Sequence, residues 1–274
     1  MPDAASAPII TFLSDYGLQD DFVGICHGVM ARSCPSARVI DLTHGIPRHD
    51  VRAGAIVLSE ALAYLPAGVH LAVVDPDVGA QRRAIALRLA DGRLLVGPDN
   101  GLLSPAAAAG GGVAEAVDIA RSGYRLQPVS ATFHGRDIFA PVAAALAAGV
   151  APADAGEPLD PETIVSLELP QPTRDGDALV AHVRYIDRFG NLQLDAGHEH
   201  LTDAGLKLGR PALVELADGT SHPVHFVRTF ADAGRDELLL YEDAQRRLAI
   251  AVRHGDAAAL LGLTVDAELR IRPG

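Results

Sequence analysis

The first half of the chain alternates short apolar runs with longer amphipathic segments, and this order restricts the fold more than any other feature. Strands are expected at Ile9–Leu13, Val39–Leu42 and Val69–Val74. Helices are expected between them, over 21–33 and 52–64. Strands that alternate with helices usually form a largely parallel sheet covered on both faces. We therefore predict a layered α/β domain in the N-terminal part.

The pattern changes near Leu167. The segment Leu169–Gly176 is rich in proline and turn residues, which is typical of a linker. Short β-like runs follow, separated by turn residues, at Ala178–Ile186, Leu213–Leu216, Pro223–Phe230, Leu238–Tyr241 and Leu248–Val252. They predict a smaller antiparallel, β-barrel-like domain. The expected boundaries are 1–168 for the α/β domain, 169–176 for the linker and 177–274 for the β domain.

The composition is that of a globular chain with an acidic balance. The 274 residues are 49% hydrophobic, which suffices for a sizeable core, and the formal net charge is −12. Nucleic-acid binding needs clustered Lys and Arg to neutralise phosphates, so we expect no nucleic-acid partner. An acidic field also mildly favours cationic substrates over phosphates.

Neither export nor membrane insertion is indicated. The first ten residues lack the basic start and apolar stretch of a signal peptide. Uncharged apolar runs stay well short of the ~20 residues that span a bilayer. The two cysteines, Cys26 and Cys34, cannot make a disulfide framework. We expect a cytoplasmic protein without a membrane partner.

Histidine and cysteine spacing does not predict a metal site. There is no Cys-x-x-Cys pair and no His-Glu-x-x-His, and His198-Glu199-His200 is too closely spaced for that helical zinc motif. The remaining histidines, which include His27, His44, His49 and His70, are expected to be structural or surface groups. No metal and no cofactor are expected.

Polar clusters stand beside the predicted strands, where ligands bind in open α/β sheets. Four belong to the first domain, and a fifth closes the first strand of the second: Ser14–Gly17, Asp75–Arg83, Gly97–Gly101, Thr132–Asp137 and Asp187–Asn191. None has the Gly-x-Gly-x-x-Gly or Gly-Lys-Ser/Thr pattern of a phosphate-binding loop. A nucleoside without phosphates is therefore a more plausible ligand than NAD or ATP.

Five motifs occur in an order that resembles one known family: Thr11–Gly17, Val74–Gly79, Pro98–Leu103, Thr132–Pro141 and Asp187–Asn191. In these motifs the chain is similar to the S-adenosylmethionine hydroxide adenosyltransferases, relatives of the fluorinating and chlorinating adenosyltransferases. The resemblance runs from Ile9 to Leu263. It implies hydrolysis of S-adenosylmethionine to adenosine and methionine. It also implies homotrimers whose sites lie between the N-terminal domain of one subunit and the C-terminal domain of another.

By this resemblance the catalytic residues are Asp75, Arg82 and His134. Arg82 is preferred to Arg83 because the family's arginine falls seven residues after the aspartate. Neutral water is a poor nucleophile, so His134 and cationic Arg82 would hold it in line and stabilise developing hydroxide. We expect His134 and Asp75 to share the water proton while Arg82 stabilises charge.

The resemblance also implies the residues that bind substrate. Asp15 would accept hydrogen bonds from both ribose hydroxyls, which suits the two oxygens of a carboxylate. Asp187 would hold the methionine ammonium, and Asn191 would face the adenine. The remaining expected contacts are Tyr16, Asn100, Phe133, Gly135 and Phe189, of which the aromatic residues would form apolar walls or stack on the base.

Each of these residues also has a structural interpretation. Taken alone, Asp75 could cap a turn before Pro76, Arg82 could be a solvated cation, and His134 could be an ordinary satisfied histidine. Three other functions stay open at this point. One is a halide adenosyltransferase that makes a 5′-halogenated adenosine, and another is a non-catalytic protein that binds adenosine or S-adenosylmethionine. The third is a structural or interaction role.

Overall fold

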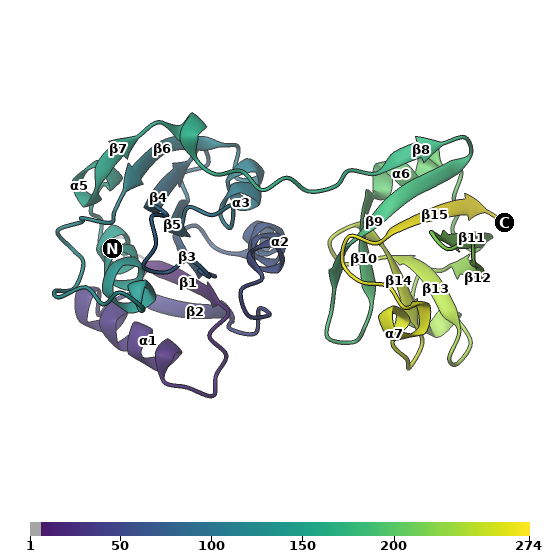
Figure 1. The fold of residues 1–274 in the computed structure, drawn as a ribbon, viewed down its shortest axis with the longest axis horizontal. Coiled ribbons are helices and arrows are strands. Elements are labelled where there is room, and N and C mark those ends of the chain that lie inside the picture. Colours follow the sequence, from purple (N-terminus) through teal and green to yellow (C-terminus); the bar gives the residue numbers. More distant parts are fainter. Residues whose placement is uncertain (1–6) are drawn as a thin grey trace, which may run out of the picture. The chain divides into compact units, whose positions relative to one another are not determined.

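The computed structural model describes residues 7–274, which divide between Leu167 and Glu168 into two compact units (Figure 1). Residues 1–6, part of the segment compared with signal peptides, lie outside the described residues. Each unit has a hydrophobic core of its own. Within 7–274, every helix is too short or too polar to cross a bilayer.

The N-terminal unit is built on a sheet with strand order β2-β1-β3-β5-β4-β6-β7. Its strands are β1 (Ile9–Ser14), β2 (Arg38–Thr43), β3 (Val69–Val73), β4 (Ala84–Leu89), β5 (Leu94–Pro98), β6 (Val113–Asp118) and β7 (Glu157–Leu159). The neighbours β2, β1, β3 and β5 run parallel, whereas β4, β6 and β7 are joined by antiparallel pairings. The predicted α/β domain with a mostly parallel sheet is confirmed.

Helices cover this sheet. They are α1 (Phe22–Ser33), α2 (Val51–Ala61), α3 (Ser104–Ala109), α4 (Ala140–Ala147) and α5 (Pro152–Ala155), with short turns η1 (Leu62–Tyr64), η2 (Gly135–Phe139) and η3 (Pro161–Thr163). Helix α1 packs on α4, and α2 packs on α3. All five residues of β3 are buried, which explains why its sequence reads as a continuous apolar run.

The strand order creates a switch point beside β1. The chain passes from β1 to β2 on one side and then returns to β3 on the other, so β1 lies between them. In the register of β1 and β3, Ser14 stands opposite Val73. The residues that follow these two strands therefore emerge together, at the position where open α/β sheets bind ligands.

The C-terminal unit is a closed seven-stranded barrel with one added strand. Its strands are β8 (Thr173–Asp175), β9 (Ala178–Ile186), β10 (Leu192–Gly197), β11 (Pro211–Leu216), β12 (Ser221–Phe226), β13 (Leu238–Glu242), β14 (Arg247–Val252) and β15 (Glu268–Pro273). Pairing of β9 with β10 closes the ring. All its pairings are antiparallel except β12 with β13.

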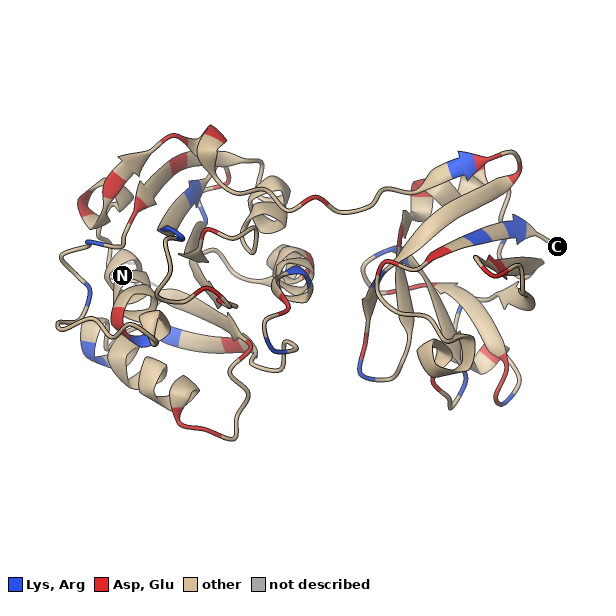
Figure 2. Ribbon diagram, in the orientation of Figure 1, with Lys and Arg blue, Asp and Glu red and all other residues tan. Residues whose placement is uncertain are grey.

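Short helical segments complete this unit, namely α6 (His198–Asp203), η4 (Phe230–Asp232) and α7 (Ala257–Leu261). The predicted barrel-like domain is confirmed. Strand β8 lies inside the range expected to be a linker, and it pairs with β9. Figure 2 shows the positions of acidic residues along the ribbons of both units, with Lys and Arg interspersed among them.

Candidate functional site

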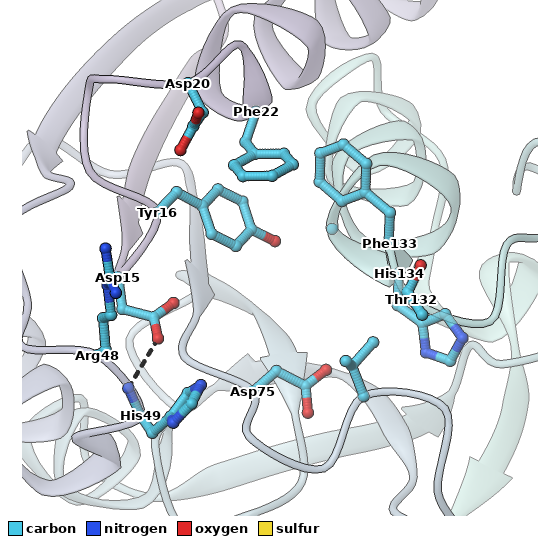
Figure 3. A pocket seen from close by; sticks show the side chains of 12 residues that line it. Asp15, Tyr16, Asp20, Phe22, Arg48, His49, Asp75, Thr132, Phe133 and His134 are labelled. Atoms are coloured by element: carbon cyan, nitrogen blue, oxygen red, sulfur yellow. Dashed lines mark hydrogen bonds between the residues drawn. The ribbon is translucent and has the colours of Figure 1, made fainter.

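A pocket of about 290 Å³ lies in the N-terminal unit, where β1 and β3 end (Figure 3). It is lined by Asp15, Tyr16, Asp20, Phe22, Arg48, His49, Asp75, Val78, Thr132, Phe133, His134 and Gly135. Six of the residues expected from sequence are among them. The chain brings them together from three separate segments: the end of β1, the end of β3 and the start of η2.

Asp75, Arg82 and His134 form one connected group. Nε of Arg82 donates to Oδ1 of Asp75 at 2.8 Å, and its Nη2 pairs with Oδ2 of the same carboxylate. Nη2 of Arg82 also lies 2.9 Å from Nδ1 of His134. Arg82 therefore links Asp75, seven residues before it, to His134, 52 residues after it. The Asp75 and Arg82 side chains are only 6% and 9% exposed.

The contact between Arg82 and His134 defines the state of the imidazole. A guanidinium has no acceptor, so Nδ1 of His134 must accept and its neutral form carries the proton on Nε2. Burial, followed by the positive charge of Arg82, lowers the pKa of His134 against the opposing carboxylates of Asp75 and Asp137. At neutral pH the group offers an Nε2–H donor.

A close backbone approach brings the segment of Asp75 and Arg82 next to the segment of His134. Gly79 has a φ of +83°, and a Cβ there would overlap the carbonyl oxygen of Ala131, just before the His134 segment. Nδ2 of Asn100 donates to the carbonyl of Val74 at 2.9 Å, and its Oδ1 accepts from Leu102. Asn100, expected to touch substrate, thus bonds to the backbone beside Asp75 and is not among the residues that line the pocket.

The opposite side of the pocket carries Asp15. Its Oδ2 accepts the backbone N–H of His49 at 2.9 Å, as the dashed line in Figure 3 marks. His49 has a φ of +65°, which is uncommon for a residue with a side chain. Sequence analysis treated His49 as a structural or surface group, but it lines the pocket. That unusual backbone region is found disproportionately at functional sites.

Three aromatic rings form an apolar wall. Tyr16 contacts Phe133 with ring centroids 5.9 Å apart and Phe22 at 5.8 Å, and Phe22 contacts Phe133 at 5.3 Å. Burial raises the pKa of Tyr16 well above its ordinary value, so its hydroxyl keeps its proton. In Figure 3 this hydroxyl points into the space between Phe133 and Asp75. Gly135 is needed here, because a Cβ would overlap that hydroxyl.

Five lining residues besides His49 were not among the predicted site residues: Asp20, Phe22, Arg48, Val78 and Thr132. Val78 and Thr132 lie inside the polar clusters that follow or precede the predicted elements. Phe22 begins α1, and Arg48 precedes α2. Phe22 and Arg48 reach the pocket because these helices start at the same edge of the sheet, and the polar clusters do not extend to them.

The remaining expected residues belong to the C-terminal unit, in the turn between β9 and β10. Oδ1 of Asp187 accepts from the backbone N–H groups of Phe189 and Asn191 at 2.8 and 3.0 Å, and Oδ2 accepts from Nδ2 of Asn191 at 2.8 Å. The Phe189 side chain is 69% exposed. The turn is therefore internally bonded and presents an aromatic ring to its surroundings.

Comparison with known proteins identifies the family. Residues 10–156 match the SAM hydroxide adenosyltransferase N-terminal domain, and residues 181–270 match the C-terminal domain of that family. The chain belongs to the SAM hydroxide adenosyltransferase family. The family expected from the five motifs is thus confirmed.

Named relatives match most of the length of this chain. It is 52% identical to the "(R)-S-adenosyl-L-methionine hydrolase" of Salinispora tropica, over 98% of this chain and 100% of that protein. It is 37% identical to the protein of that name from Thermus thermophilus, over 96% and 98%. A protein named "Fluorinase" from Actinoplanes sp. is 30% identical over 89% and 90%.

The fold agrees with this assignment. An uncharacterised conserved protein from Thermotoga maritima superposes with a TM-score of 0.90 at 33% identity, over 96% of this chain and 99% of that one. A conserved hypothetical protein from Thermus thermophilus gives a TM-score of 0.76 at 35% identity, with the same coverage.

Proposed function

We propose that this adenosyltransferase hydrolyses S-adenosylmethionine, releasing adenosine and L-methionine. The observation that carries the proposal is the contact of Arg82 with two pocket-lining residues, Asp75 and His134, in a chain 52% identical to a protein named "(R)-S-adenosyl-L-methionine hydrolase". Arg82 itself is not among the residues that line the pocket. The relatives named as hydrolases carry the (R) form in their names, so we propose the (R) sulfonium epimer as the preferred substrate.

The reaction is a substitution at the ribose C5′ carbon. A water oxygen forms the new bond to C5′ while the C5′–S bond breaks. The electron pair of the C5′–S bond stays on sulfur, which converts the sulfonium into the neutral thioether of methionine. Because the leaving group is neutral, it needs no general acid. One proton must leave the water, and the products are adenosine, methionine and that proton. No cofactor or metal is required.

His134 and Asp75 would divide the handling of the water. Because Nδ1 of His134 accepts from Arg82, its Nε2–H donates to the water oxygen and orients it. In this proposal His134 therefore does not share the water proton with Asp75, the role expected from sequence. Asp75 lines the pocket and accepts the proton as the bond to carbon forms. Arg82 fixes both partners and limits the negative charge on Asp75. Low solvent exposure strengthens these interactions.

Substrate binding would use both units. Asp15 is placed to accept the ribose hydroxyls, and the rings of Tyr16 and Phe133 form an apolar wall beside the nucleoside. Asp187, Phe189 and Asn191 would complete the site from a neighbouring subunit of a homotrimer. The pocket in the N-terminal unit is at the small end of ligand sites, which supports a site completed by another surface.

The test of the reaction is product analysis in isotopically labelled water. Each sulfonium epimer is incubated separately in H₂¹⁸O, with and without chloride, and the products are separated and weighed by mass spectrometry. We expect ¹⁸O in the 5′-hydroxyl of adenosine and faster turnover of the (R) epimer. A 5′-chlorinated nucleoside as main product would favour the halide reaction, and binding without methionine release would favour a non-catalytic role.

A shared site can be tested separately by complementation. Co-expression of Asp75→Asn with Asp187→Asn chains should yield mixed oligomers in which some sites have both residues intact. We expect each variant alone to be nearly inactive and the mixture to recover part of the activity. Light scattering supplies the mass of the assembly. Cytoplasmic location stays a prediction, which fractionation of the source cells would test.

A further inference from the structure

Three side chains that can ligate metals converge beside the first two strands, apart from the catalytic group. His27 lies on α1, Asp41 lies on β2, and His44 follows that strand. Nε2 of His27 is 2.8 Å from Oδ1 of Asp41, and Nε2 of His44 is 3.0 Å from the same oxygen. We propose that His27, Asp41 and His44 bind one divalent first-row transition-metal ion, such as Zn²⁺.

His44 is oriented as a metal ligand would be. Its side chain is only 2% exposed, and Nδ1 lies 2.8 Å from the Ser14 hydroxyl. Its Nε2 is buried and lacks the alignment of a hydrogen bond despite its proximity to Asp41. When Nδ1–H donates to Ser14, Nε2 carries a lone pair directed at the cluster. A ligating histidine usually donates its second ring N–H to an oxygen acceptor, and the Ser14 hydroxyl takes that place here.

The other two ligands can adjust around this fixed nitrogen. One candidate ligand atom from each residue lies within 4.8 Å of the others. Bonds of about 2.0–2.2 Å to a shared tetrahedral ion place the ligand atoms about 3.3–3.6 Å apart, so Oδ1 of Asp41 must move slightly away from the two Nε2 atoms to admit the ion. The Asp41 and His27 side chains are 42% and 36% exposed, so both have room to rotate. The buried ring of Phe12 packs against both imidazoles, at 4.7 Å from His44 and 6.2 Å from His27.

The chemistry of the three ligands limits the choice of ion. Two imidazoles and one carboxylate suit Zn²⁺, Co²⁺, Ni²⁺ or Fe²⁺ better than Mg²⁺ or Ca²⁺, which prefer all-oxygen sites. Solvent would supply the remaining ligands on the exposed side.

An ion here would restrain the loop that supplies part of the pocket. The carbonyl of His44 accepts the backbone N–H of Gly17 at 2.8 Å, and Ser14 Oγ accepts that of Tyr16 at 3.3 Å. His27 belongs to the helix that begins at Phe22, which lines the pocket. The ion thus joins α1 to β2 and braces the segment between Ser14 and Phe22. It takes no part in the proposed hydrolysis, so this inference does not depend on that reaction.

The test is a metal titration of chelator-treated full-length protein. Co²⁺ is added while its visible absorption is recorded, and Zn²⁺ is then added to displace it. We expect one ion per chain in the wild type. Zn²⁺ should also raise the melting temperature, since a ligand of the native state stabilises it by mass action. Hydrogen exchange at Gly17 should slow when Zn²⁺ is present.

Two variants decide between a metal site and a plain hydrogen-bonded cluster. His27→Gln keeps an N–H donor for Asp41 but removes the imidazole nitrogen, and we expect it to weaken Zn²⁺ affinity by at least about tenfold. His198→Ala removes an exposed histidine that pairs with Glu242 at 2.5 Å, and its affinity should equal that of the wild type. Unchanged affinity in His27→Gln, or no stoichiometric binding in the wild type, would overturn the proposal.

Discussion

Arg82 donates a hydrogen bond from Nη2 to Nδ1 of His134 across 2.9 Å. This contact fixes the tautomer of the imidazole and couples its protonation to a neighbouring cation. A doubly protonated His134 would lose the bond and face the guanidinium as a like charge. The contacts of the site therefore stabilise the neutral form of His134.

The acid limb of kcat/KM should lie below the ordinary histidine pKa of 6.5. Burial and Arg82 lower the pKa of His134, so the neutral imidazole persists as the pH falls through 6.5. Activity should be lost only at lower pH, where Nδ1 becomes protonated. The pH profile of kcat/KM measures this, and ¹⁵N NMR of the imidazole should report a proton on Nε2. A limb above pH 6.5 would contradict the assignment.

The buried pair of Asp75 and Arg82 should contribute to stability as well as catalysis. Asp75→Asn leaves the guanidinium without its counter-charge among side chains that are 6% and 9% exposed. We expect a loss of about 3 kcal/mol in the free energy of unfolding, because removal of one partner leaves the other buried charge unpaired. Urea denaturation measures this loss. Catalytic activity should fall by at least about 100-fold.

The matched control is the double variant Asp75→Asn with Arg82→Gln. Because it removes both charges, it should regain part of the lost stability while remaining inactive. If Asp75→Asn unfolded at the same urea concentration as the wild type, the pair would make no net contribution to the free energy of unfolding. Its role would then be restricted to the chemistry.

Sequence reasoning recovered the elements whose burial is visible locally. Strands β1 and β3 are buried on both faces and read as apolar runs, and polar residues follow them where the chain leaves the sheet. The strands β6, β7, β8, β10 and β15 were not predicted. In β15, burial alternates along Glu268–Pro273 between core-facing and solvent-facing residues, so charged residues interrupt its apolar signal.

The site shows where such reasoning ends. Arg82 and Arg83 are adjacent and chemically identical, and only the family spacing distinguished them. In the structure, Arg83 turns away to Asp99, with Nε donating to Oδ2 at 2.7 Å, whereas Arg82 joins Asp75. Likewise, His49 reaches the pocket through its backbone bond to Asp15. Contacts of this kind depend on tertiary approach and leave no periodic pattern in the chain.

His70 should make the N-terminal unit less stable in mild acid. It is fully buried, and burial lowers its pKa to about 4. The unfolded chain then binds more protons than the folded one between about pH 4 and 6.5, so stability falls as the pH decreases through that window. From about pH 7.5 to about pH 5, this single group should cost about 2 kcal/mol.

The His70→Asn variant isolates this effect. The Asn amide can still bond to Oγ1 of Thr11, which lies 2.9 Å from Nδ1 of His70, but it does not titrate. Urea denaturation at the two pH values should show a smaller loss of stability for this variant than for the wild type. His225→Asn, at an exposed position on β12, is the control and should retain the wild-type pH dependence. Equal slopes in all three proteins would rule out the assignment.

The final prediction concerns the fit of Gly135 against Tyr16. A Cβ at position 135 would overlap the Tyr16 hydroxyl and lie 3.1 Å from Cζ of the same ring. Gly135→Ala should therefore displace the ring from the aromatic wall and reduce kcat/KM by at least about tenfold, since small displacements of positioning groups are costly. Tyr16→Phe in the same chain removes the overlapping oxygen and should restore part of that loss.

Gly28→Ala, on α1 with open space around it, should leave kcat/KM unchanged and stabilise the helix by about 0.5–1 kcal/mol. Steady-state kinetics on these four proteins and the wild type, with Tyr16→Phe alone included, distinguish a steric cause from a general sensitivity to alanine. If the second substitution failed to relieve the first, the contact between Tyr16 and Gly135 would not set the shape of the pocket.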